Sequence, residues 1–531
     1  MLGEYPNADR SSVDMWNGNF GCICRASGTA HLSSLWFVEN TNVQTATSAS
    51  ADPMPSESVE ATAAEDQHFD VVVIGGGPGG YGAALYGASA GLNVALIEMD
   101  KIGGTCLHRG CIPAKELLET ASIVRTVKHA AEFGVIVEPK TVDWSITLQR
   151  KQEVINKLAG GVVMLLKNRK VTMFNGLGSL GPDKRVHVIG RDGEQATISG
   201  DAVILAPGSV PRVIQGFEPD GTTVVTSDEF FHLTQIPRRA VVIGGGAIGC
   251  EFASTLADLG SSVTVLEALP KVLPGCDDDV TRVVLQSFKK KGITVRAGVA
   301  VTGHTPNPVG GTTVQFGDGE TIDTDVVVVS VGRVPYTGGL LDAGTAVQIS
   351  DRGHLEVDSL CRTAEASVWA VGDAIASPQL AHVAFAEGIL AIKDILGESP
   401  APIDYGKVPW AIYCHPEVAF SGHSEASAKA AGYEVVVSKH RFAGNSRAQI
   451  LGETDGLVKI IAEKRADGTA GTVLGVHMVG PWVTEQLSGG YLAVNWEATV
   501  DEVAELIQPH PSLTELFGES MLALTGRSLH G

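Results

Sequence analysis

The sequence predicts an α/β protein built from two dinucleotide-binding units and a separate C-terminal α+β domain. A compact apolar run over 69–74 is followed by a glycine-rich turn, a small-residue helix and a second strand over 94–98. The same β-α-β pattern recurs over 240–267. From about residue 407 strands and helices continue without a nucleotide motif, which indicates a third kind of domain.

Length and charge limit the possible functions. A chain of 531 residues has room for about three or four domains. The formal net charge of -21 argues against nucleic acid or an anionic membrane surface as the main partner, because both need a basic patch. The sequence has no apolar run long enough for a membrane helix and no basic-then-apolar start typical of a signal peptide. We therefore expect a cytoplasmic protein.

The first 66 residues differ from the rest. Residues 45–66 are rich in Ala, Ser, Thr and Glu without apolar periodicity, which predicts a disordered N-terminal extension over 1–66. Met54 opens a shorter start just before the first strand, so residues 1–53 are interpreted as an upstream artefact or a dispensable leader.

Two glycine turns carry the nucleotide signal. In each, a G-x-G-x-x-G pattern follows a strand and opens a helix, and an acid lies 23 positions after the first glycine. The glycines permit a tight turn and close backbone approach to a pyrophosphate, while the acid can bind ribose hydroxyls. A carboxylate at position 267 favours NAD over NADP, although Lys271 lies close in sequence. The residues are Gly75, Gly77, Gly80 and Glu98 in the first unit, and Gly244, Gly246, Gly249 and Glu267 in the second.

Two of the eight cysteines stand in a setting that suggests chemistry. Cys106 and Cys111 lie within the segment 103–115, directly after the first β-α-β unit. A structural zinc site needs a second matching pair, and the nearby sequence has none, so no metal is expected. Two inert thiols remain an alternative to a thiol–disulfide pair beside a cofactor. The other six cysteines are too sparse for a disulfide scaffold.

The segment 103–115 resembles the active-site signature of the pyridine nucleotide-disulfide oxidoreductases, in the form seen in dihydrolipoyl dehydrogenases. The resemblance covers about residues 67–531. It implies two Rossmann-like domains, FAD in the first and NAD in the second, and a C-terminal dimerisation domain. It also implies that Cys106 is exposed to substrate, that Cys111 lies against the flavin, and that Lys115 lies near the flavin with Glu251 as its carboxylate partner.

The resemblance further implies domain boundaries and cofactor contacts. The first part of the FAD-binding domain is expected at 67–216, the NAD-binding domain at 217–345, the second FAD-binding or central part at 346–406 and the interface domain at 407–531. A strand ending in Gly-Asp places Asp373 on the FAD; a plain turn aspartate is the alternative. The remaining implied cofactor contacts are Gly104, Thr105, Gly208, Gly332, Leu380, Ala381 and His382.

A base is expected near the C-terminus. Disulfide exchange needs a thiolate and a proton acceptor, and histidine suits that role near neutral pH. His510 precedes Pro511, so a helix is expected to start just after it and Glu515 to fold back onto the ring. The sequence resembles the family's His-Pro-x-x-x-Glu motif, which implies a catalytic pair supplied by the partner subunit of a homodimer.

The implied activity is oxidation of protein-bound dihydrolipoyl groups with reduction of NAD. The partner would be a lipoyl-bearing acyltransferase or lipoyl carrier protein of a 2-oxo acid dehydrogenase or glycine cleavage complex. Glutathione-type and mercuric reductases are alternatives, disfavoured by Glu267 and by the lack of any cysteine after Cys414; a non-catalytic flavin- or NAD-binding regulator is a third. Two residues depart from the family pattern: Pro207 removes a backbone donor, and Gln508 stands where a second histidine is common.

Overall fold

The computed structural model describes residues 67–138 and 141–530. The extension expected over 1–66 lies outside these residues. The first unit contains a parallel layer in the order β3-β2-β1-β5-β16, and β4 joins the far ends of β3 and β5 in antiparallel pairing. The strands are β1 (Gln67–Ile74), β2 (Val94–Glu98), β3 (Thr172–Leu180), β4 (Arg185–Gly190), β5 (Gln195–Leu205) and β16 (Val368–Ala370).

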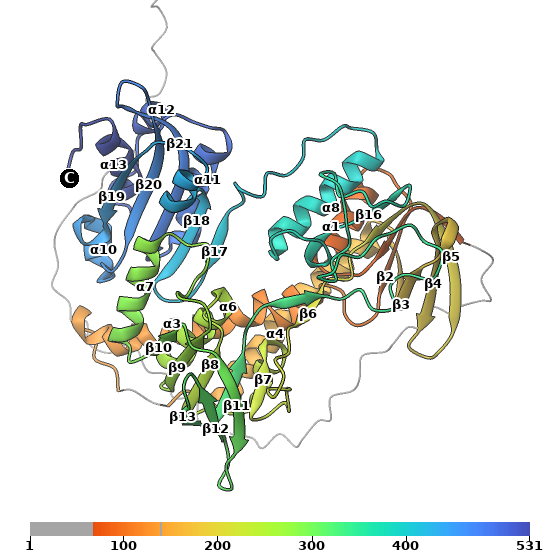
Figure 1. The fold of residues 1–531 in the computed structure, drawn as a ribbon, viewed down its shortest axis with the longest axis horizontal. Coiled ribbons are helices and arrows are strands. Elements are labelled where there is room, and N and C mark those ends of the chain that lie inside the picture. Colours follow the sequence, from red (N-terminus) through yellow and green to blue (C-terminus); the bar gives the residue numbers. More distant parts are fainter. Residues whose placement is uncertain (1–66, 139–140, 531) are drawn as a thin grey trace, which may run out of the picture. The chain divides into compact units, whose positions relative to one another are not determined.

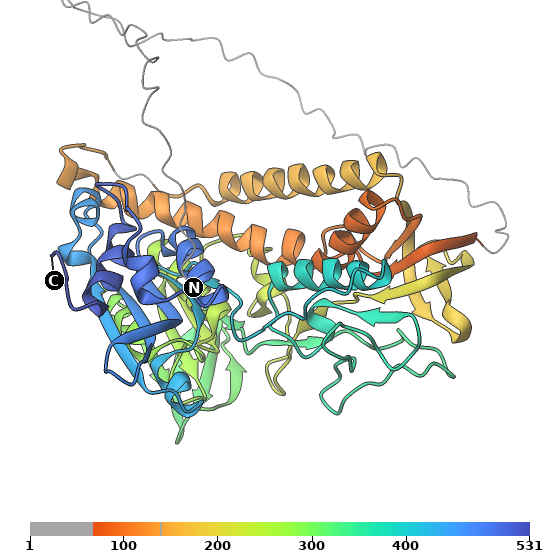
Figure 2. The same ribbon diagram turned by 90° about the horizontal axis from the view of Figure 1, so that it is seen from above.

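Helices follow the strands of the first unit, and the last of these helices packs against the first. Helix α1 (Pro78–Ser89) crosses α8 (Ala381–Ile395), while α2 (Gly104–Arg109) is followed directly by α3 (Cys111–His129). Figure 2 shows α4 (Trp144–Asn168) running beside α3.

The second unit repeats the arrangement. All five strands of its main sheet are parallel, in the order β10-β9-β8-β14-β7 (Figure 1). Helix α6 (Ala247–Asp258) follows the glycine turn directly, with Gly246 as its N-cap. The other elements are β7 (Val224–Thr226), α5 (Ser227–Phe230), β8 (Arg239–Ile243), β9 (Ser262–Glu267), α7 (Asp278–Lys290), β10 (Thr294–Ala297) and β14 (Val326–Val329).

Both parallel layers have a point where the strand order reverses, between β1 and β5 in the first and between β8 and β14 in the second. Ligands of open α/β sheets bind at such points, beyond the carboxyl ends of the strands. Each glycine turn begins there. Two smaller sheets complete these units: β11 (Val301–Pro306), β12 (Thr312–Phe316) and β13 (Glu320–Thr324), and the pair β6 (Ser209–Pro211) with β15 (Arg333–Pro335).

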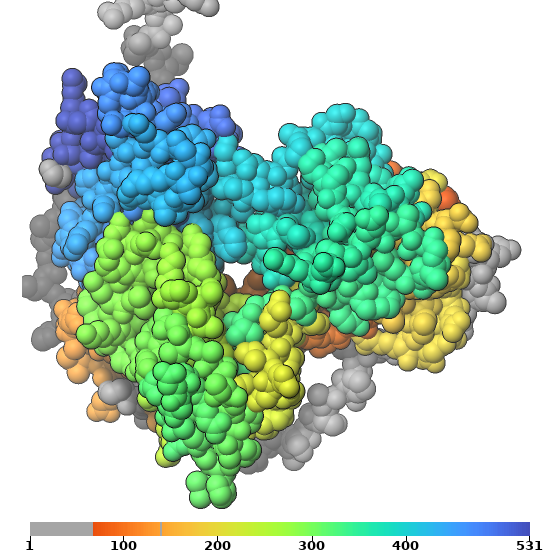
Figure 3. All heavy atoms as spheres, viewed as in Figure 1, coloured from red at the N-terminus to blue at the C-terminus, as the bar shows by residue number. Residues whose placement is uncertain are grey.

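The C-terminal domain is an antiparallel sheet in the order β17-β18-β21-β20-β19 with helices on one face. One face shares a core with the second unit, through residues such as Val418 and Val479, and the other packs on the helices. Figure 3 shows the second unit lying against this domain. Its elements are β17 (Trp410–Ile412), β18 (Glu417–Gly422), α9 (Glu425–Ala430), β19 (Val435–Arg441), α10 (Ser446–Leu451), β20 (Leu457–Lys464), β21 (Ala470–Gly480), α11 (Val483–Asn495), α12 (Val500–Ala504) and α13 (Glu515–Leu524).

The helix expected just after His510 begins only at Glu515, so that prediction was wrong. Residues 511–514 form bends and a turn instead. The reason is a competing hydrogen bond: the backbone N–H of Ser512 donates to the Glu515 carboxylate at 2.8 Å. That bond folds Glu515 back toward His510, as expected, but outside a helix.

The close crossing of α1 and α8 depends on glycine. A Cβ added at Gly388 would lie 2.5 Å from the carbonyl oxygen of Gly79. We expect Gly388→Ala to lower the free energy of unfolding by about 1–3 kcal/mol, because the helices must move apart. Chemical denaturation of the holoprotein measures this.

Gly160→Ala is the matched control. Gly160 lies in the exposed middle of α4, and an added Cβ there meets nothing within 4 Å. Alanine should therefore raise stability by about 0.5–1 kcal/mol. Equal effects of the two substitutions would contradict a steric role for Gly388.

Candidate functional site

A cavity of about 860 Å³ lies where the two nucleotide-binding units meet. Both glycine turns line it, and so do Cys106 and Cys111. The sulfur pair and both turns therefore face one space, in a volume typical of a site for a cofactor or small ligand. Cysteines placed away from the glycine turns would not have supported a redox role for the pair.

The N-termini of α1 and α6 are suited to phosphate. Their N-caps, Gly77 and Gly246, provide no side-chain cap, and neither helix carries an acid in its first turn. Both N-caps line the cavity, so the unpaired backbone N–H groups at these ends can donate to an anion. Gly75 has φ +106°, and a Cβ there would lie 2.1 Å from the Ala206 carbonyl oxygen. The chain thus supplies two close backbone cradles, which fit a dinucleotide each.

The two acids of the nucleotide motifs also stabilise their own turns. Glu98 accepts hydrogen bonds from the backbone N–H groups of Gly76 and Asp100, both at 2.7 Å. Glu267 accepts from Gly245 at 2.5 Å and Leu269 at 2.7 Å. Burial raises the pKa of Glu98 above its ordinary value despite these bonds. Each carboxylate has further acceptor capacity.

The cysteine pair is asymmetric. Cys111 is the first residue of α3, while Cys106 lies in α2. A hydrogen bond from Cys106 lowers the pKa of Cys111 to about 7, and Lys115 contributes in the same direction against burial. The same hydrogen bond and burial raise the pKa of Cys106. In the reduced pair, Cys111 is therefore the thiolate.

Lys115 links the pair to the rest of the molecule. Its Nζ donates to both carboxylate oxygens of Glu251 at 2.9 Å and lies 4.7 Å from the centre of the Tyr413 ring. Burial alone would lower the pKa of Lys115, but Glu251 raises it above its ordinary value. Glu251 also accepts from the Tyr413 backbone N–H at 2.9 Å. The expected Lys115–Glu251 partnership is present.

A polar chain from the second unit reaches Asp373. The Ser209 hydroxyl donates to Asp373 at 2.6 Å, and Arg333 donates to the Ser209 oxygen at 2.7 Å and to Thr105 at 3.4 Å. Arg333 and Asp373 both line the cavity. Sequence reasoning missed Arg333, although its position directly after Gly332, shortly beyond the buried strand β14, was an available signal.

The cavity brings together most of the expected site residues. Gly80, Gly244, Gly249, Glu267 and His382 are not among its lining residues. The ring of His382 contacts the Pro409 carbonyl oxygen at 2.8 Å. Expected residues that line the cavity are Gly75, Gly77, Glu98, Gly104, Thr105, Cys106, Cys111, Lys115, Gly208, Gly246, Glu251, Gly332, Asp373, Leu380 and Ala381. Pro207, one of the two departures, also lines it.

His510 and Glu515 do not line the cavity of their own chain. They form a pair in the C-terminal domain, with His510 Nδ1 and Glu515 Oε1 2.8 Å apart. Burial raises the pKa of Glu515, but the bonds from Ser512 and His510 hold it below its ordinary value. The His510 side chain is 73% exposed, so it can be presented to another surface.

Comparison with known proteins identifies the family. The model of the pyridine nucleotide-disulphide oxidoreductases matches residues 69–388, and that of their dimerisation domain matches 408–521. The chain belongs to this family. As a family member, it is an oxidoreductase of the class that uses FAD and NAD(P), with a dimerisation domain that suggests a homodimer.

Relatives and solved structures agree with this family. The chain is 40% identical over 474 residues to a dihydrolipoyl dehydrogenase of Bacillus subtilis, covering 87% of this chain and 99% of the relative. A dihydrolipoyl dehydrogenase of Chlamydia muridarum is 37% identical, covering 88% and 98%. The crystal structure of LpdA from Mycobacterium tuberculosis has a TM-score of 0.80 at 27% identity, covering 86% and 99%. The Cu(II) complex of RclA, an HOCl-induced flavoprotein disulfide reductase from Escherichia coli, shares the fold, with a TM-score of 0.77 at 24% identity, covering 86% and 99%.

Within the described residues, no helix is long and apolar enough to cross a membrane. Over the same ranges, no group of three or more His, Cys, Asp and Glu side chains is placed to hold a metal ion.

The asymmetry of the cysteine pair can be measured. In the reduced protein we expect one thiolate to form with a midpoint near pH 7, the pKa of Cys111. The thiolate is present above this pH and lost below it. The ultraviolet thiolate absorbance of the wild type minus that of Cys111→Ser isolates the signal.

Lys115→Met tests the cause of the shift. Loss of the ammonium group should move the midpoint upward, because Lys115 favours the charged form of Cys111. An unchanged midpoint in Lys115→Met, or a wild-type midpoint close to that of an ordinary thiol, would be inconsistent with this site.

Proposed function

We propose that this protein is a dihydrolipoyl dehydrogenase, which oxidises protein-bound dihydrolipoyl groups to lipoyl disulfide and reduces NAD to NADH. The observation that carries the proposal is that the Cys106–Cys111 pair and both nucleotide turns line one cavity. Its partners would be a second copy of the chain and a lipoyl-bearing acyltransferase or lipoyl carrier protein of a 2-oxo acid dehydrogenase or glycine cleavage complex. The cytoplasm, where sparse cysteines stay reduced, is the proposed location.

The first unit is assigned to FAD and the second to NAD. Cys111 and Lys115 follow the first turn in sequence and line the same cavity, which supports a flavin on that side. At the second turn, Glu267 would repel a 2′-phosphate, and the nearby Lys271 is already paired with Asp278 at 2.6 Å. These features favour NAD over NADP.

The chain's own residues account for the thiol chemistry. A dihydrolipoyl thiolate attacks Cys106 of the oxidised pair, the Cys106–Cys111 bond breaks, and Cys111 leaves as a thiolate. The second lipoyl sulfur then attacks the first, which forms the lipoyl disulfide and releases Cys106. The lowered pKa of Cys111 makes it the better leaving group of the two. When bound, FAD would supply the redox chemistry that links the reduced cysteine pair to NAD.

His510 is the proposed proton acceptor for the dihydrolipoyl thiol, with Glu515 orienting its ring and stabilising its charged form. Because neither residue lines the cavity of its own chain, we assign them to the cavity of the partner subunit. One active site would then need two chains.

Another FAD-dependent disulfide reductase, glutathione- or mercuric-reductase-like, is the second candidate. The fold likeness to RclA supports only the wider class, because the identity is below the level that carries function. Glu267 speaks against NADP, and no cysteine follows Cys414 to form a second C-terminal pair. A side-by-side assay of dihydrolipoamide and glutathione with NAD and NADP, with the flavin spectrum recorded, separates the candidates; glutathione turnover with NADPH would overturn the proposal.

Removal of single groups should abolish turnover. We expect Cys106→Ser, Cys111→Ser and His510→Gln each to lower dihydrolipoamide-dependent NAD reduction by about a hundredfold or more. Steady-state rates at equal flavin content measure this. His129→Gln is the control, because His129 forms an exposed pair with Glu132 at 2.8 Å and does not line the cavity; near-normal turnover in the first three variants would be incompatible with the mechanism.

Mixed dimers test the shared site. Cys106→Ser and His510→Gln homodimers should both be inactive. A heterodimer of the two, purified through different tags, contains one complete site of two and should show about half the wild-type activity. An inactive heterodimer would place His510 and Cys106 in the same site of one chain.

A further inference from the structure

A row of paired residues crosses the C-terminal sheet on the face toward the second unit. The strand register aligns Lys439, Lys459, His477, Phe420 and Trp410, one from each strand. Directly opposed residues in antiparallel strands share a face. The Trp410 and Phe420 rings stack at 5.7 Å, and the Phe420 and His477 rings at 5.3 Å. Trp410 and Phe420 line the cavity, so the row leads from the cavity wall to two lysines.

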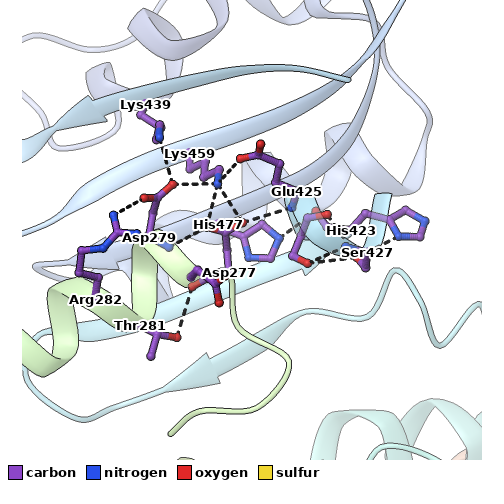
Figure 4. Close-up of polar contacts among 12 residues, drawn as sticks. Asp277, Asp279, Thr281, Arg282, His423, Glu425, Ser427, Lys439, Lys459 and His477 are labelled. Atoms are coloured by element: carbon purple, nitrogen blue, oxygen red, sulfur yellow. Dashed lines mark hydrogen bonds and ion pairs between the residues drawn. The ribbon is translucent and has the colours of Figure 1, made fainter. Parts of the chain in front are cut away.

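Lys459 is buried among carboxylates at the far side of this row (Figure 4). It is 2% exposed, and its Nζ donates to Asp277 at 2.9 and 3.0 Å, to Asp279 at 2.9 Å and to Glu425 at 2.8 Å. Burial lowers the pKa of the neighbouring His477 to about 4, which leaves its ring uncharged. Lys459 is therefore the central positive charge of the cluster.

Asp277 connects this cluster to the cavity. It is 3% exposed, caps α7 through the Asp279 N–H at 2.9 Å, and ends the loop 268–277 between β9 and α7. The same loop lines the cavity with Leu273, Pro274 and Cys276.

The loop has a second anchor at the other end of its cavity-lining part. The backbone N–H of Leu273 donates to the Gly245 carbonyl oxygen at 2.8 Å, in the second glycine turn. Leu273 adopts a left-handed conformation, φ 52°, which costs free energy and needs surrounding contacts to hold it. The cavity-lining residues are therefore held between Gly245 on one side and the Asp277–Lys459 contact on the other.

We propose that Lys459 is a positioning residue for the nicotinamide dinucleotide: through Asp277 it holds the loop 268–277 in the shape that lines the second nucleotide site. The inference rests on the assignment of that site to NAD. Lys459 touches no substrate. Its effect passes through Asp277 to Leu273, Pro274 and Cys276.

The alternative is that the cluster only fastens the second unit to the C-terminal domain. A fastening role would reduce stability and slow every step of the reaction together. A positioning role would weaken NAD binding while leaving thiol chemistry at Cys106 and Cys111 unchanged. The two roles can therefore be distinguished by whether NAD binding changes alone or together with stability and thiol chemistry.

The test is Lys459→Met in the oxidised holoenzyme. We expect the Kd for NAD, measured by calorimetry, to rise about fivefold, as for other residues that act on a ligand without contact. The KM for NADH in ferricyanide reduction should rise in parallel. Flavin reduction by dihydrolipoamide in the absence of NAD should stay within about twofold of wild type.

Two further variants keep the test decisive. Lys439→Met is the matched control, because Lys439 donates to Asp279 at 3.1 Å from a half-exposed position and makes no contact with Asp277. Its Kd for NAD should not change. Asp277→Asn combined with Lys459→Met removes the unpaired buried charge while keeping an α7 cap, so stability should recover and the Kd should stay high.

An unchanged Kd in Lys459→Met, or a Kd that returns to normal in the double variant, would overturn the inference. A parallel fall of NAD binding, flavin reduction and melting temperature would also overturn it in favour of fastening. If the wild type binds NAD but does not oxidise dihydrolipoamide, the proposed function fails instead, and the Kd comparison still decides the role of Lys459.

Discussion

The ion pair between Lys115 and Glu251 determines how the parts of this molecule meet. Lys115 belongs to α3 of the first unit and Glu251 to α6 of the second, while the Tyr413 N–H from the C-terminal domain donates to the same carboxylate. A carboxylate as buried as Glu251, 6% exposed, is stable only when paired and hydrogen-bonded. Satisfying it therefore requires three segments to converge beside Cys111, one helical turn from Lys115.

The two nucleotide units share the same turn structure, and together they form one cavity that neither unit forms alone. In each, the acid at the end of the second strand accepts a hydrogen bond from the backbone N–H of the middle glycine, which stabilises the turn. Each turn leaves a helix N-terminus without a side-chain cap. Because Lys115 and Glu251 fix the units against each other, both free N-termini border the same cavity. Electron transfer between two dinucleotides needs that proximity.

Local patterns allowed much of this to be predicted, and long-range contacts explain the rest. The strand over 94–98 was found where the sequence indicated it, because that signal lies within the element itself. The start of α13 was wrong because Glu515 binds the Ser512 N–H outside the helix. His382 is expected at the cofactor from the resemblance; the contact of its ring with the Pro409 carbonyl oxygen, 27 residues away, is one that the sequence did not indicate.

Arg333 and Lys459 show the limit more clearly. Their partners Ser209 and Asp277 lie 124 and 182 residues away in sequence, so no local spacing could indicate them. A lysine within an apolar strand indicates a buried ion pair only once the carboxylates that face it are known. The sequence indicates the chemistry of each residue, whereas the fold determines which residues pair with one another.

The separation of His510 from the cavity of its own chain has a functional consequence under the proposed mechanism. The sulfur pair and the two nucleotide turns, which would hold the electron-carrying cofactors, all line the cavity of one chain. The group that accepts the substrate proton lies on the dimerisation domain, exposed and already oriented by Glu515. Thiolate formation must precede disulfide exchange, so the first chemical step depends on a second copy of the chain. Dimerisation is then a condition of catalysis, because a monomer would hold the complete electron route without the base that starts it.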